Sequence, residues 1–153
     1  MTSTAPPPRI DKNMDDACTS VTSEISRTDG KASLLLAFNG AALAGLASVA
    51  DKELPLPTKL FGTAAVLALG MAAVLLLLVV RPRLSGADRA SFPYWARLDE
   101  DEIRDRMQSD TRAARIQVLS ALAVSKFLYL RRAVDLSLAA LTLLALAAAG
   151  AAL

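Results

Sequence analysis

Basic side chains recur in the stretch that leads into the last apolar segment of this chain, and their chemistry is that of anion recognition. The members of this set are Arg112, Arg115, Lys126, Arg131 and Arg132. A guanidinium group binds phosphate oxygens through paired N–H donors, whereas an ammonium group binds them as a point charge. The same residues can equally fix the membrane topology of the chain or contact anionic lipid head groups. Their spacing leaves all three hypotheses open.

Acidic side chains offer less chemistry than their number suggests. Residues 99–102 are consecutive acids, but neighbouring helix positions point in different directions, so these carboxylates do not converge on a metal ion. We interpret the run as a helix start, in which Asp99 caps the helix and Glu102 reaches back to it. Residues 81–132 hold eleven basic and seven acidic residues, a balance too mixed for an arm that binds nucleic acid.

Catalytic residue types are scarce. The chain has no histidine and one cysteine, Cys18, which excludes an intrachain disulfide and histidine-based acid–base chemistry. A metal site built from histidine and cysteine is not expected for the same reason. The sequence also lacks a recognisable nucleophile–base pair and a glycine-rich phosphate loop. We therefore expect a protein that is not an enzyme and that holds no metal or cofactor.

Three long apolar segments must hold the polar and charged side chains in position. They cover residues 32–50, 60–80 and 133–153. A bilayer core about 30 Å thick needs roughly 20 apolar residues in a helix, because each residue rises about 1.5 Å. Hydrophobic residues make up 54% of the chain and its mean hydropathy is +0.39, which is too apolar for an ordinary soluble domain. The sequence predicts three membrane spans.

Lysine and arginine residues near the span ends predict the orientation, because they are retained on the cytoplasmic side of a membrane. Residues 1–31 hold four of them and residues 81–132 hold eleven, against two in the connection at 51–59. We therefore expect the N-terminus and the 81–132 segment in the cytoplasm and the C-terminus outside. The connection with Pro55 and Pro57 should be a short external loop.

The cytoplasmic part is predicted to be helical after a disordered tail at residues 1–9. Residues 10–31 carry an apolar stripe with alternating spacings of three and four, and only Gly30 interrupts the passage into the first span. A second helix should start near Asp99 and run through the rest of 81–132 into the last span without a break. The predicted fold is all-α: a three-span membrane helix bundle with a cytoplasmic two-helix stalk.

The first span contains one amide and a row of small residues. Asn39 needs a hydrogen-bond partner in hydrocarbon, which favours a contact with another helix. Gly40, Ala44 and Ser48 recur at four-residue spacing and would let a second helix approach closely. Two hypotheses follow. These residues form an oligomer seam or pore lining, or they pack against the chain's own second or third span.

Two motifs resemble those of the transmembrane effectors of Pycsar antiphage systems. The first is RTDGKASLLLAFNGA at residues 27–41, where a polar Asp-x-Lys-Ala step precedes Leu-Leu-x-Phe-Asn. The second is QVLSALAVSKFLYLRRAVDL at residues 117–136, which leads into the last span. Together with the order of the spans, the resemblance covers the chain from about residue 12 onward.

The resemblance implies a function. In such systems a cyclase makes cyclic UMP or cyclic CMP on infection, and the effector then impairs the inner membrane and kills the cell before phage mature. It implies an oligomeric inner-membrane protein of abortive infection, with one of these nucleotides as its activating ligand and a functional link to a pyrimidine cyclase. The candidate nucleotide-binding residues carried over from the motifs are Arg27, Asp29, Lys31, Gln117, Ser125 and Lys126.

A non-enzymatic membrane scaffold is the alternative hypothesis. The apolar stripes at residues 10–28 and 103–128 suit a helical stalk that binds a protein partner without any small ligand. A cyclase gene beside this one would favour the effector, and its absence would favour the scaffold.

Overall fold

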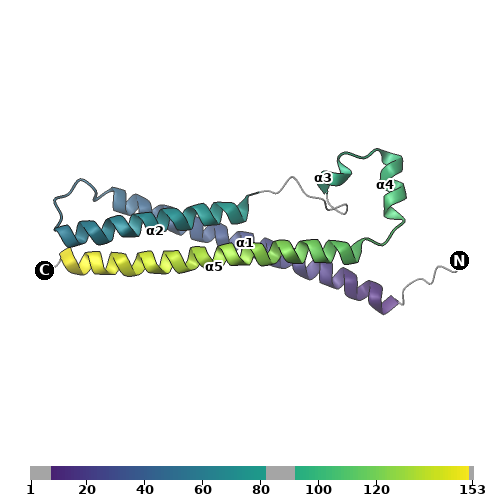
Figure 1. Ribbon diagram of the computed structural model, residues 1–153, viewed down its shortest axis with the longest axis horizontal. Helices are drawn as coiled ribbons and strands as arrows, with labels where there is room; N and C mark the ends of the chain where they lie inside the picture. Colours follow the sequence, from purple (N-terminus) through teal and green to yellow (C-terminus); the bar gives the residue numbers. More distant parts are fainter. Residues whose placement is uncertain (1–7, 82–91, 152–153) are drawn as a thin grey trace. The chain divides into compact units, whose positions relative to one another are not determined.

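The computed structural model of the chain describes residues 8–81 and 92–151, and the regular secondary structure of this part is all helical (Figure 1). The helices are α1 (Pro8–Ala47), α2 (Leu56–Val80), α3 (Phe92–Trp95), α4 (Glu100–Met107) and α5 (Arg112–Ala151). No strand occurs in this part of the chain, which confirms the predicted all-α fold. Most of the tail expected at residues 1–9 lies outside the described residues, and α1 begins at Pro8.

Three helices are long and apolar enough to cross a membrane. The stretches that qualify are Ile10–Ala47, Leu56–Val80 and Arg112–Ala151. In α1 a largely polar first half leads into an apolar second half in one uninterrupted helix, and in α5 a first half with several charged residues leads into an apolar second half. The structure thus contains three candidate membrane-spanning helices, as predicted, and the continuous helix from residue 10 through Gly30 into the first span is confirmed.

The start of α2 shows how proline fits a helix. Pro55 is the capping residue and Pro57 is the second helical position, where a backbone N–H would have no partner within the helix. The helix therefore begins at Leu56, four residues before the predicted apolar segment at 60–80. Thr58 is buried in this first turn, and its hydroxyl donates to the carbonyl oxygen of Ala147 at 3.2 Å.

The start of α4 is the helix start predicted at the acid run. The Asp99 carboxylate accepts the backbone N–H of Glu102 at 2.8 Å, and the Glu102 carboxylate accepts the backbone N–H of Asp99 at 3.3 Å. This reciprocal pair is a capping box, and it places the acids where the helix dipole is positive. Asp99 and Glu102, the first and last acids of the run, therefore cap this helix.

The predicted unbroken helix from Asp99 into the last span is wrong. Helix α4 ends at Met107 and α5 begins at Arg112, with residues 108–111 between them. The Ser109 hydroxyl donates to the carbonyl oxygen of Arg106 at 3.0 Å, and the Asp110 carboxylate accepts the backbone N–H of Arg112 at 3.0 Å. Short polar side chains of this kind compete with the helical hydrogen bonds, so a helix can end without proline or glycine.

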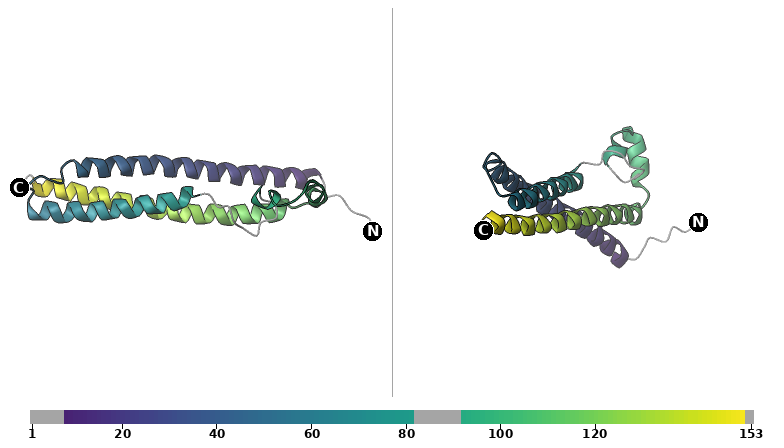
Figure 2. Two further views of the ribbon diagram at one scale, coloured as in Figure 1. Left: turned by 90° about the horizontal axis from the view of Figure 1, so that it is seen from above. Right: turned by 60° about the vertical axis from the view of Figure 1, so that its left-hand side comes forward.

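The chain divides into two compact units, one formed by residues 28–81 and 126–153 and the other by residues 1–27 and 82–125. In the first of these units, α2 lies alongside the C-terminal part of α5 in every view (Figures 1 and 2). The buried core of this unit includes Ala32, Leu76, Val79, Leu130 and Ala133. Alanine at contact positions lets helices approach closely, which is how membrane helices gain packing energy.

Candidate functional site

An ion pair joins α1 to α5 at the start of their apolar parts. The ammonium nitrogen of Lys126 lies 2.6 and 2.8 Å from the two carboxylate oxygens of Asp29. The Lys126 side chain is only 13% exposed, and that of Asp29 is 36% exposed. Partial burial raises the strength of this contact above that of a surface pair, because water screens it less. Two of the six predicted nucleotide-binding residues therefore bind each other.

The other candidates lie apart from this pair. The Arg27 guanidinium pairs with Glu24 one turn earlier, at 3.0 Å, and the Ser125 hydroxyl donates to the carbonyl oxygen of Leu122 at 2.8 Å. Lys31 and Gln117 are exposed. The role of all six residues in nucleotide binding stays a prediction.

Asn39 and the small residues of the first span lie on different faces of α1. Asn39 is fully buried and donates to the Ser137 hydroxyl of α5 at 3.1 Å, and that hydroxyl also donates to the carbonyl oxygen of Ala133 at 2.9 Å. Gly40, Ala44 and Ser48 are exposed, and a Cβ added at Gly40 would meet nothing within 4 Å. The amide serves packing within the chain, whereas the small-residue face is left uncovered by it.

Arg112 gathers three carboxylates at the beginning of α5. It contacts Asp110 at 3.0 Å and Asp15 at 3.2 Å, and it also pairs with Asp11. Asp11 and Asp15 are one turn apart on α1, so both can face the same guanidinium. The sequence identified Arg112 only as a candidate phosphate ligand. The sequence did hold a sign of this contact: Asp11 and Asp15 are four residues apart in a helix that was expected to pack against another helix, so one cation there could bind both.

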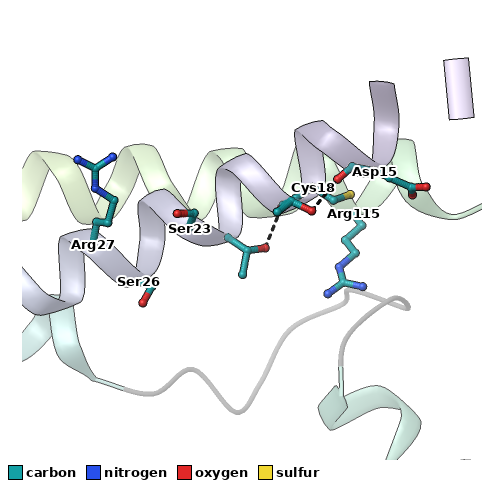
Figure 3. Close-up of a pocket in the computed structure, with 8 residues that line it drawn as sticks. Asp15, Cys18, Ser23, Ser26, Arg27 and Arg115 are labelled. Carbon is teal, nitrogen blue, oxygen red and sulfur yellow. Dashed lines mark hydrogen bonds between the residues drawn. The ribbon is translucent and has the colours of Figure 1, made fainter. Parts of the chain in front are cut away.

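A hollow of about 700 Å³ lies in the unit formed by residues 1–27 and 82–125 (Figure 3). We call this hollow the Ser/Thr groove. Its described lining residues are Asp15, Cys18, Thr19, Thr22, Ser23, Ser26, Arg27 and Arg115. Seven of them come from α1, where they form two adjacent rows with a spacing of four residues: Asp15, Thr19, Ser23 and Arg27 in one row, and Cys18, Thr22 and Ser26 in the other. Sequence reasoning missed this groove, although the recurrence of hydroxyl residues at 19, 22, 23 and 26 was visible.

These features define a class: an all-helical membrane protein with an ion pair at the start of its apolar segments and a buried amide–hydroxyl contact within them. The family model described as "Pycsar effector protein domain" (PycTM) matches residues 13–153. The chain therefore belongs to this family of antiphage defence effectors, as the motifs at 27–41 and 117–136 indicated. Comparison with curated proteins and with solved structures gives no match.

Proposed function

We propose that this protein is a non-enzymatic effector that responds to cyclic UMP or cyclic CMP by impairing the integrity of the bacterial inner membrane, so that infection is aborted. The observation that carries the proposal is the family match over residues 13–153, which includes nearly all of the three membrane-length helices. The nucleotide comes from a pyrimidine cyclase that acts with the effector.

The Asp29–Lys126 contact gives this response a physical basis. It ties α1 to α5 just before their apolar segments at 32–50 and 133–153. A ligand whose binding weakened this ion pair would favour a second packing of the spans. A ligand shifts such an equilibrium only by its differential affinity for the two states, so the apo packing must hold the site in a weaker-binding form.

The uncovered face of α1 supports an oligomeric effector. Gly40, Ala44 and Ser48 are exposed within one chain, and membrane helices associate through small residues that allow close backbone approach. We infer that copies of the chain meet along this face. The distribution of basic residues supports a cytoplasmic N-terminus and 81–132 segment, which puts the nucleotide-binding parts on the side where a cyclase works.

Dye efflux from liposomes that contain the purified full-length protein tests this function. Cyclic UMP and cyclic CMP are added separately, with cyclic AMP as the control nucleotide and protein-free liposomes as the control vesicles. Efflux triggered by one pyrimidine nucleotide is expected. If vesicles with correctly oriented protein stay sealed with both pyrimidine nucleotides, the effector proposal fails and the scaffold hypothesis takes its place.

A further inference from the structure

The Ser/Thr groove has an unusual density of hydroxyl groups for one side of a helix. Thr19 and Thr22 donate their hydroxyl protons to the carbonyl oxygens of Asp15 and Cys18, at 2.9 and 2.8 Å, so their oxygens remain available as acceptors. Ser23 and Ser26 are exposed, and their hydroxyls make no hydrogen bond within the described part of the chain. The groove therefore offers both donors and acceptors to a polar ligand.

The charges around the groove leave one cation uncompensated. Asp15 is paired with Arg112 at 3.2 Å, and Arg27 is paired with Glu24 at 3.0 Å. The Arg115 side chain is exposed, and its guanidinium makes no hydrogen bond or ion pair in the part of the chain that the structure describes. In Figure 3 its side chain extends past α1 on the same side as Ser26, whereas Arg27 points to the opposite side. A guanidinium with free N–H donors is suited to a phosphate.

We propose that the Ser/Thr groove is the nucleotide-binding site, with Arg115 bound to the phosphate and the hydroxyls of α1 bound to the sugar and base. Its volume of about 700 Å³ suits a ligand of nucleotide size. This assignment rests on the proposed function and moves the ligand from the motif residues Asp29 and Lys126 to residues 15–26 and Arg115. An anionic lipid head group shares the phosphate chemistry, so the test separates the two sources.

Cys18 provides the test, because it lines the groove and is the only cysteine of the chain. The rate at which a maleimide labels Cys18 is measured on the full-length protein in a zwitterionic detergent, with cyclic UMP, cyclic CMP, cyclic AMP or phosphatidylglycerol added. The pyrimidine nucleotide that triggers efflux should slow labelling. Slowing by phosphatidylglycerol alone would overturn the assignment and identify a lipid site.

Arg115→Gln and the matched control Arg97→Gln separate the site from general charge effects, because Arg97 is also exposed but does not line the groove. R115Q should raise the nucleotide concentration for half-maximal protection about tenfold or more, as expected for a lost charged hydrogen bond. R97Q should leave it unchanged. Equal shifts in the two variants would overturn the role of Arg115.

Efflux and labelling together distinguish the two proposals. Nucleotide-triggered efflux without any change in Cys18 labelling would overturn the groove and leave the effector function standing. Absence of both responses would overturn the effector function and the nucleotide assignment with it.

Discussion

Lys126 binds both carboxylate oxygens of Asp29 from the neighbouring helix, at 2.6 and 2.8 Å, and the lysine side chain is nearly buried. The pair is the link between the two sequence motifs that identify the family, since Asp29 lies in residues 27–41 and Lys126 in residues 117–136. Replacing one partner of such an ion pair costs more stability than replacing both, because the remaining charge stays half-buried without a partner.

Replacing either partner should therefore destabilise the protein, and replacing both should cost no more than the worse single change. We expect Asp29→Asn or Lys126→Gln to lower the free energy of unfolding by about 1–3 kcal/mol, between the values for surface and buried pairs. Thermal unfolding in detergent measures the effect. Lys31→Gln is the control, because Lys31 is exposed two residues further along α1. Additive losses in the double variant would show that the two charges act independently.

The hydrogen bond between Asn39 and Ser137 should contribute to the packing of α1 against α5. Ser137→Ala leaves the fully buried amide of Asn39 without this partner, and we expect a loss of about 1 kcal/mol, as for other hydrogen bonds between membrane helices. Thr142→Ala is the matched control, since the Thr142 hydroxyl is exposed and bonds only the carbonyl oxygen of Leu138. Reversible unfolding in mixed micelles compares the two. Equal losses would contradict the role of the bond.

Replacing either of two glycines by leucine should have different effects on the stability of the chain. A Cβ at Gly150 would already lie 3.4 Å from the Thr58 hydroxyl, so Gly150→Leu should overpack this contact and cost about 1–3 kcal/mol. Gly40→Leu meets open space and should leave the stability of the single chain within about 0.5 kcal/mol of the wild type.

The same Gly40→Leu variant tests assembly. If copies meet along the Gly40 face, the leucine should reduce the oligomer fraction seen by chemical cross-linking in liposomes. Gly62→Leu, on α2, is a control, because a Cβ there also meets nothing within 4 Å. An unchanged oligomer fraction in the Gly40→Leu variant would exclude this face as the seam.

The stability that the Asp110–Arg112 contact gives to the start of α5 should depend on pH only in the acid range. Hydrogen bonds from the Arg112 side chain and backbone hold the pKa of Asp110 below its usual value of 3.8. Because the pKa is lower in the folded state, the stabilising contribution is complete above that usual value and is lost as the pH falls through the folded-state pKa. Arg112→Gln should raise the Asp110 pKa toward 3.8 in an NMR titration of the carboxyl carbon. An unaltered titration would exclude Arg112 as the cause.

Periodic patterns made most of the helical fold predictable. Apolar length identified the three spans, and the spacing of three and four from residue 10 onward identified α1 as one helix despite Gly30. Asp99 and Glu102 indicated the start of α4, because a capping box depends on two residues three positions apart. These features are local, so a single sequence contains them.

The contacts between distant residues were beyond the sequence. Asp29 and Lys126 are 97 positions apart, and nothing in their own segments says that one will neutralise the other. The end of α4 was missed for another reason: Ser109 and Asp110 bond the backbone locally, and their helical propensities alone do not show which outcome prevails. The Ser/Thr groove needed both the α1 face and the approach of Arg115 from α5.

Substitutions on the two faces of α1 should affect different molecules. A substitution at Asn39 is felt by the chain that carries it, because its partner Ser137 belongs to the same chain. A substitution at Gly40 is felt by whatever molecule lies beside the helix in the bilayer. In a cell that makes wild-type and mutant copies together, loss-of-function alleles of the inner face should be recessive. If copies meet along the Gly40 face, a substitution there that keeps the mutant copy out of the assembly should also be recessive, whereas one that still assembles but blocks the response should be dominant, because it would disable its wild-type neighbours.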